Sequence, residues 1–182
     1  MDIPTGIVPA VRQMKDFEKA LGSEANTIFF LETRLAQLKS LINYSKREGK
    51  QVLLHFDLIQ GLKADEYGME FLIREIKPDG IISTRGNIIK LAKKHELLAI
   101  QRMFLLDSMA LDHNLELIDR FKPDCVELLP GLIPDIIQHI NEKTGVPVIA
   151  GGLIRDQNEV SSALNAGAIA VSTSNTELWR SH

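Results

Sequence analysis

Eight short apolar runs alternate with amphipathic segments along almost the whole chain, and this alternation limits the folds that the chain can adopt. The amphipathic segments space apolar residues three and four positions apart, as in Leu35, Leu38, Leu41 and Ile42, which is typical of a helix with one buried face. Strands separated by helices favour parallel pairing, because parallel neighbours need a crossover connection. The predicted strands are 6–11, 27–31, 51–57, 80–83, 97–104, 125–130, 146–150 and 168–173.

Eight strand–helix units predict a compact α/β fold, the (βα)8 barrel of the TIM type. The chain has 182 residues, which is fewer than the roughly 200 typical of that fold, so its loops must be short. Only about nine residues follow the last strand, and the eighth helix, in 175–182, should therefore be truncated. An open doubly wound sheet is the alternative. No linker or low-complexity segment divides the sequence, and we expect residues 1–182 to form a single domain.

Composition excludes several classes of protein. A single cysteine, Cys125, rules out an intramolecular disulfide framework and a multi-cysteine metal site. The sequence shows neither a signal peptide nor an apolar stretch near the ~18 residues of a membrane span. We therefore expect a cytoplasmic protein that does not contact the membrane. The net charge of −3 does not by itself suggest nucleic-acid binding, which usually shows as a basic excess.

Two adjacent glycines, Gly151 and Gly152, follow the seventh predicted strand, and the sequence Ser-Thr-Ser-Asn (172–175) ends the eighth. In this fold the loops after strands 7 and 8 commonly bind phosphate, because backbone N–H groups can approach an anion closely there. We predict that Gly151, Gly152, Thr173 and Ser174 bind a phosphate group. A tight turn without a ligand is the alternative. Box-like pairs, Asp156 with Glu159 and Ser174 with Glu177, should cap the helices that follow.

Polar residues near the other strand ends should face the same mouth of the barrel. We predict that His55, Asp57, Arg102 and Glu127 contact the hydroxyl groups of a small polyol phosphate. A convincing catalytic set is missing: the histidines lie mostly in or near helices, and no predicted strand carries an interior lysine for Schiff-base chemistry. We expect no catalytic residue, no metal and no cofactor. A sugar-phosphate isomerase, epimerase or aldolase is the alternative.

A weak internal repeat places Lys-Pro-Asp before two of the predicted strands, in 77–82 and 122–128. Shared turn chemistry is the favoured interpretation, since proline stops the preceding helix. A duplicated half-barrel is the alternative.

Several distinctive stretches span about 7–179: PAVRQMKDFEKAL, LLHFDLIQGLK, KPDGIISTRGN, AIQRMFLLDS, ELLPG and the segment from VIAGGLIRDQNEV to STSNTELW. Together they resemble the glycerol uptake operon antiterminator regulatory proteins. The resemblance implies a regulator rather than an enzyme. It implies that glycerol 3-phosphate is the effector, and that the partner is the leader mRNA of a glycerol catabolic operon, in which termination is prevented.

The sequence leaves the RNA-binding face open. Basic residues gather on two predicted helices, and we consider them candidates for RNA contacts, with Tyr44 available for stacking. They are Lys46, Arg47, Lys90, Lys93 and Lys94. Ordinary solvated helix faces are the alternative. A truncated eighth helix should leave Leu178 and Trp179 exposed, which predicts a homo-oligomer. The loop 57–66 is a candidate for movement on effector binding.

Overall fold

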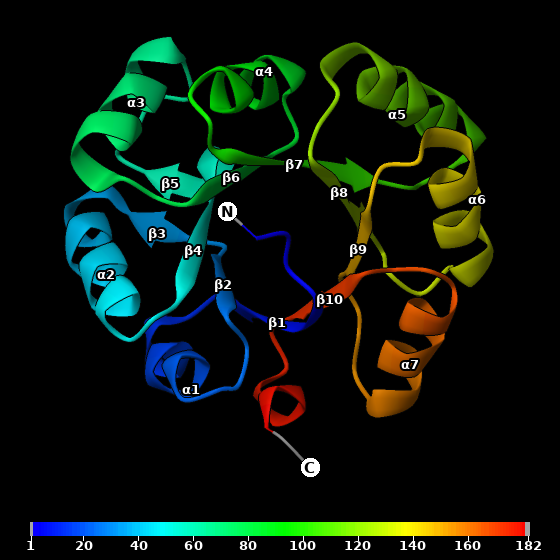
Figure 1. The fold of residues 1–182 in the computed structure, drawn as a ribbon, viewed down its shortest axis with the longest axis horizontal. Helices are drawn as coiled ribbons and strands as arrows, with labels where there is room; N and C mark the ends of the chain where they lie inside the picture. The colour runs from blue at the N-terminus through cyan, green and yellow to red at the C-terminus, as the bar shows by residue number, and fades with distance from the viewer. Residues whose placement is uncertain (1, 181–182) are drawn as a thin grey trace.

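The computed structural model describes residues 2–180, and these form a closed barrel of eight parallel strands inside a ring of helices (Figure 1). The strand order around the barrel is β1-β10-β9-β8-β7-β6-β4-β2, which confirms the predicted fold and excludes the open sheet. The barrel strands are β1 (Gly6–Val11), β2 (Thr27–Phe30), β4 (Gln51–His55), β6 (Gly80–Ser83), β7 (Leu98–Phe104), β8 (Cys125–Leu129), β9 (Val148–Gly151) and β10 (Ala170–Thr173).

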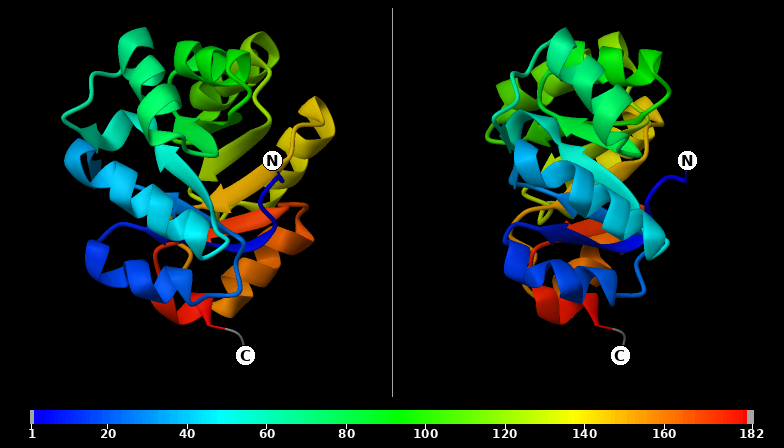
Figure 2. Two further views of the ribbon diagram at one scale, coloured as in Figure 1. Left: turned by 60° about the vertical axis from the view of Figure 1, so that its left-hand side comes forward. Right: turned by 90° about the vertical axis from the view of Figure 1, so that its left-hand side faces the viewer.

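Helices surround the strands on all sides, as the side views show (Figure 2). The helices are α1 (Phe17–Leu21), α2 (Leu35–Arg47), α3 (Glu66–Phe71), α4 (Gly86–Lys94), α5 (Ser108–Phe121), α6 (Pro134–Thr144) and α7 (Gln157–Asn165). A π-helical turn, Leu72–Ile76, continues α3. Within residues 2–180, no helix is both long enough and apolar enough to cross a bilayer.

A second, very small sheet was not predicted from the sequence. It pairs β3 (Thr33–Arg34) with β5 (Ile59–Gln60) in parallel, so the loops that follow β2 and β4 are joined at the mouth of the barrel. Each strand has two residues, which is too short to produce a periodic pattern.

Apolar side chains fill the barrel interior. They come from every second residue of the strands, because successive side chains of a strand point to opposite faces. Leu53, Ile82, Ile100, Cys125 and Ile149 belong to this interior cluster. The opposite faces of the strands pack against the helices in two further apolar clusters. Two positions further toward the mouth, several strands place polar side chains in the interior, among them His55, Glu127 and Ser172.

The Lys-Pro-Asp repeat forms the same clamp twice at the end where the strands begin. The Asp79 carboxylate accepts a hydrogen bond from the Val52 N–H (2.8 Å), and Asp124 accepts one from Ala99 N–H (2.9 Å). In each clamp a helix lysine donates to the carbonyl of the repeat lysine: Lys46 to Lys77 (2.7 Å) and Lys93 to Lys122 (2.6 Å). The same two lysines pair with the aspartates, at 3.2 and 3.0 Å. The repeat therefore makes the same structural contacts at both places, in line with the turn-chemistry interpretation.

The last described residues close the ring between α1 and α7 as a 3-10 turn, Thr176–Trp179 (Figure 1). The expectation that Leu178 and Trp179 are exposed is wrong, since both are buried. The Trp179 indole also donates to the carbonyl of Thr173 (2.8 Å). This removes the reason given for self-association, and the oligomeric state stays a prediction.

The clamps predict a specific stability change. Asp124→Ala should lower the free energy of unfolding by about 1–3 kcal/mol, because it leaves the Ala99 N–H without its acceptor and the Lys93 ammonium without its carboxylate partner. Asp112→Ala, at an exposed position of α5, is the matched control and should change it by about 0.5 kcal/mol or less. Urea denaturation of both variants measures the difference. Equal stabilities would show that the clamp contributes nothing.

Candidate functional site

The two loops that follow β9 and β10 lie side by side at the mouth of the barrel. The Asn175 side-chain amide donates to the Arg155 carbonyl (2.8 Å), and the Thr173 hydroxyl donates to that of Ile154 (3.3 Å). A cleft of about 400 Å³ opens beside them. It is lined by Ala10, Arg12, Leu31, Arg102, Glu127, residues 152–155 and residues 172–175.

The two glycines have different roles. A methyl group at Gly151 would lie 2.5 Å from the Ser172 hydroxyl and 3.0 Å from a Glu127 carboxylate oxygen, so Gly151 makes room for a contact between those side chains. Gly152 has φ +77°, in the left-handed region that favours glycine, and a methyl group there would meet Leu129 at 3.1 Å. Gly152 lines the cleft, whereas Gly151 is not among the lining residues.

Backbone N–H groups are available in both loops. Those of Gly152, Leu153 and Ser174 find no hydrogen-bond acceptor among residues 2–180. By contrast, the Asn175 N–H donates to the Thr173 hydroxyl (3.1 Å). Of the four residues predicted to bind phosphate, Gly152 and Ser174 therefore offer free donors. Thr173 is buried and serves mainly to connect the loops, although it lines part of the cleft.

The predicted helix caps are half confirmed. The Asp156 side chain accepts from the Glu159 N–H (3.0 Å), and Glu159 accepts from the Arg155 N–H (2.6 Å) and from its guanidinium (2.7 Å). These hydrogen bonds lower the pKa of Glu159 and raise that of Arg155. The Ser174–Glu177 box is wrong: Asn175 caps the last turn by accepting from the Glu177 N–H (3.1 Å). A single 3-10 turn also lacks the dipole of a full helix.

A buried ion pair forms the floor of the cleft. The Arg102 Nε lies 3.4 Å from Glu127 Oε2, and the Ser172 hydroxyl donates to Glu127 Oε1 (2.6 Å). Glu127 is 2% exposed, yet its Oε2 has no hydrogen-bond partner of good geometry within the described chain, and neither has Arg102 Nε. The Arg102 guanidinium also lies 5.6 Å from the centre of the exposed Phe104 ring. Arg102 and Glu127, both predicted to contact a polyol, thus line the cleft.

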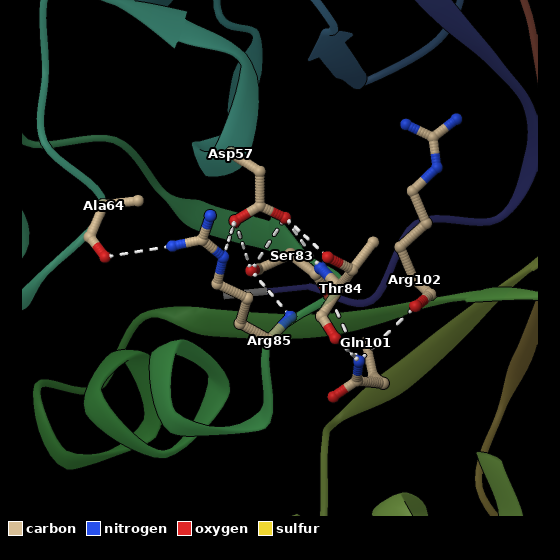
Figure 3. Close-up of polar contacts among 7 residues, drawn as sticks. All are labelled: Asp57, Ala64, Ser83, Thr84, Arg85, Gln101 and Arg102. Carbon is tan, nitrogen blue, oxygen red and sulfur yellow. Dashed lines mark hydrogen bonds and ion pairs between the residues drawn. The ribbon is translucent and has the colours of Figure 1, made fainter. Parts of the chain in front are cut away.

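Asp57 forms hydrogen bonds with residues at the end of β6 (Figure 3). It is not among the residues that line the cleft. Its carboxylate accepts from the Ser83 hydroxyl (2.8 Å) and from the Thr84 N–H (2.8 Å). Arg85 lies 3.8 Å from the same carboxylate and donates to the Ala64 carbonyl (3.3 Å). These bonds anchor both ends of the loop that was predicted to move. In the same view the Arg102 guanidinium points away from this network.

His55 faces the barrel interior at 4% exposure, outside the residues that line the cleft. Both ring nitrogens lack a hydrogen-bond partner among the described residues. Burial, and secondly the positive charge of Arg102, lower the pKa of His55 from 6.5 to about 4, although Asp57 opposes the shift. His55 is therefore a neutral interior side chain at neutral pH.

The buried cysteine is unreactive, and the described residues form no metal site. Burial, with a smaller contribution from Asp124, raises the pKa of the Cys125 thiol to about 12, so the reactive thiolate is not formed near neutral pH. Across residues 2–180 no group of three His, Cys, Asp or Glu side chains is placed to hold a metal ion.

Several residues that were predicted to contact RNA instead contact other parts of the protein. Lys46 and Lys93 belong to the two clamps at the far end of the barrel. Arg47 lies 5.6 Å from the Tyr44 ring, which itself packs edge-on against Phe17. Lys90 and Lys94 remain exposed on α4 without an ion pair to another described residue. Tyr44 is thus half-buried and engaged rather than presented for stacking.

The buried histidine predicts a particular pH dependence of stability. Since the pKa of His55 is lower in the folded chain than in the unfolded chain, the unfolded chain takes up the proton first as the pH falls. Stability should be complete above about pH 6.5 and should decrease toward pH 4, by about 3 kcal/mol at most. His55→Leu should flatten this decrease in urea denaturation, whereas the exposed control His139→Gln should not. Parallel curves for wild type and His55→Leu would contradict the assignment.

Comparison with known proteins identifies the family. Residues 7–179 match the family described as glycerol-3-phosphate responsive antiterminator. The structure is similar to the glycerol uptake operon antiterminator regulatory protein of Listeria monocytogenes, with a TM-score of 0.94 and 51% identity over 97% of this chain and 96% of that one. It is also similar to a glycerol uptake operon antiterminator-related protein of Thermotoga maritima, with a TM-score of 0.87 and 31% identity over 97% and 99% of the two chains.

A relative of unassigned role and a more distant enzyme complete the comparison. The uncharacterized protein YgcP of Escherichia coli is 34% identical over 95% of this chain and 91% of its own. Orotidine 5′-phosphate decarboxylase of Pyrococcus horikoshii has a TM-score of 0.66 at 18% identity, over 92% of this chain and 88% of that one, and shares the fold alone. The chain belongs to the glycerol-3-phosphate responsive antiterminator family, a family of regulators.

Proposed function

We propose that this protein binds glycerol 3-phosphate in the cleft at the barrel mouth and, in response, binds the leader mRNA of a glycerol catabolic operon in the cytoplasm and prevents its termination. The observation that carries the proposal is the position of free backbone N–H groups beside a buried Arg102–Glu127 pair in one cleft. Family membership supplies the effector and the kind of partner.

The phosphate group belongs on the side of the cleft formed by the last two loops. The N–H groups of Gly152, Leu153 and Ser174 can donate to its oxygens, and the Ser174 hydroxyl can add another donor. Arg12 and Arg102 also line this cleft and supply positive charge for a dianion. Arg155 contributes less, because Glu159 holds both its N–H and its guanidinium.

The glycerol end belongs on the floor of the cleft. Glu127 Oε2 is an acceptor with no hydrogen bond, so a ligand hydroxyl can donate to it. A buried acceptor that is left unsatisfied is costly, and a ligand that satisfies it gains affinity and selectivity over inorganic phosphate. His55 and Asp57 lie outside this lining, and the proposal gives them positioning roles within the barrel.

Binding rather than turnover suits this cleft. Its lining holds one acidic side chain, Glu127, which is already engaged by Ser172 and Arg102, and neither a lysine nor a histidine of the described chain is part of it. Proton transfer chemistry usually needs a second group within reach of the substrate. The proposal accordingly includes no catalytic residue and no cofactor.

A pair of glycine variants tests the effector site. Gly152→Val places a β-branched residue at φ +77°, which should displace the loop and lower the affinity for glycerol 3-phosphate at least tenfold in titration calorimetry. Gly145→Val is the matched control: Gly145 also has a positive φ (+66°), at the end of α6, where a methyl group would meet no described atom within 4 Å. Both variants should lose some stability, but the control should keep its affinity. Equal affinities would place the effector elsewhere.

The regulatory response is tested separately. Leader RNA binding to the wild-type protein should tighten in the presence of glycerol 3-phosphate, and should weaken steeply as salt is raised, because RNA phosphates release counterions on binding. Electrophoretic mobility shifts at several salt concentrations measure both effects, and glycerol alone and inorganic phosphate alone serve as controls. RNA affinity that is indifferent to the effector would refute the response, and product formation from glycerol 3-phosphate would favour an enzyme.

A further inference from the structure

We infer that the RNA backbone lies in a basic groove beside the effector cleft, rather than on the helix faces of α2 and α4. This groove is formed by Arg12, Lys15 and Lys19, which face the turn 174–176, and we call it the basic groove. The inference rests on the proposed function, because it takes the partner to be RNA.

The basic groove is a separate hollow of about 600 Å³ next to the mouth. One wall comes from the segment after β1, which includes the 3-10 turn Met14–Asp16 and α1. The other wall is the Ser174–Thr176 turn after β10. The three basic side chains are exposed, so a macromolecule can reach them.

Local charge in the groove is opposite to that of the whole chain, whose net charge is −3. Three cations share the lining with one acid, Asp16, whose carboxylate lies 3.8 Å from the Lys19 ammonium. Arg12 and Lys15 form no ion pair with any residue between 2 and 180. Elsewhere many cations are already used within the fold, as Lys46, Lys93 and Arg85 are. The groove therefore has a net positive charge, and two of its three cations, Arg12 and Lys15, are not neutralised within residues 2–180.

The shape of the groove favours an extended polyanion over a small one. Arg12 also lines a further hollow of about 360 Å³ together with Arg34 and one acid, Glu32, so cationic side chains outnumber acidic ones along this part of the rim too. Ser174, Asn175 and Thr176 offer neutral polar groups along the other wall. Lysine and arginine contacts to phosphates, with hydroxyl and amide contacts to phosphate and sugar, are the usual means of binding a nucleic-acid backbone. A single-stranded RNA segment fits this chemistry.

The groove and the effector cleft share residues, which links the two ligands. Arg12, Ser174 and Asn175 line both hollows. An effector phosphate on the Ser174 side would order this turn and Arg12 before RNA arrives. RNA binding would then cost less conformational entropy, which gives positive coupling without a large movement.

Charge-removing variants test the location. Lys15→Gln with Lys19→Gln should lower leader RNA affinity at least tenfold in the presence of glycerol 3-phosphate, and should reduce the slope of log affinity against log salt by about 1.4. The matched control is Lys90→Gln with Lys94→Gln on α4, which should bind RNA as the wild type does. Affinity for glycerol 3-phosphate should be unchanged in both, since none of these lysines lines the effector cleft.

The outcomes separate this inference from the proposed function. If the wild type responds to the effector but the Lys15/Lys19 variant binds RNA normally, or the α4 variant loses RNA instead, the location is wrong and the proposed function stands. If the effector competes with RNA, an RNA phosphate occupies the effector cleft itself, which contradicts a separate groove. A wild type that binds no leader RNA with or without effector overturns both. Crosslinking of 4-thiouridine-labelled RNA to residues 12–19 would support the location independently.

Discussion

The polar floor of the mouth depends on one missing side chain. At Gly151 a methyl group would collide with the Ser172 hydroxyl, and that hydroxyl is what fixes one oxygen of Glu127. Glu127 in turn lies against Arg102 inside the barrel. Burying a carboxylate or a guanidinium costs free energy unless the group is paired, so removing either Arg102 or Glu127 would leave the other as an uncompensated buried charge. The sequence suggested that Gly151 allows a ligand to approach the backbone. Its role is instead indirect: the absence of a side chain leaves room for the Ser172–Glu127 hydrogen bond, and so for the charged pair at the floor of the cleft.

The two ends of the barrel divide stability from recognition, as is general for this fold. At the end where the strands begin, Asp79 and Asp124 have their carboxylates satisfied by a backbone N–H and a lysine. At the mouth, by contrast, the buried Glu127 Oε2 has no hydrogen-bond partner within the described chain, and several loop N–H groups at its surface have no acceptor there. Folded chains rarely leave buried polar groups unpaired without a ligand or a solvent molecule to complete them. The contrast between a completed end and an incomplete end is the physical reason to place the effector at the mouth.

Sequence patterns predicted the features that depend on local spacing, such as strands and a helix cap. They missed the side-chain contacts between residues far apart in the sequence. All eight barrel strands follow from apolar runs, and the Asp156–Glu159 box follows from neighbours three apart. The hydrogen bonds of the Asp57 carboxylate could not be predicted, because its partners Ser83 and Thr84 are 26 and 27 residues away in the sequence. The same holds for Lys46, which reaches the Lys77 carbonyl across 31 residues. Asn175 displaced Ser174 as the cap because the last segment closes as a short 3-10 turn packed by Trp179, not as a helix with a full first turn.

An acidic chain can bind RNA only where its cations gather and where the fold has not already neutralised them. The candidates on α2 and α4 looked basic in sequence because helix positions near the C-terminus favour lysine, which interacts well with the helix dipole and with last-turn carbonyls. Lys46 and Lys93 lie in the last turns of α2 and α4 and donate to carbonyls of the clamps on neighbouring elements, whereas Lys90 and Lys94 do not take part in the clamps. Arg12 lies outside the helices and Lys15 lies in the short 3-10 turn Met14–Asp16, and no aspartate or glutamate of the described chain pairs with either of them. Their charge has no structural use that the contacts reveal, and they adjoin the loop turn that an effector phosphate would order. Under the proposed function, free charge and shared residues at one place would give a short physical route from effector binding to RNA binding.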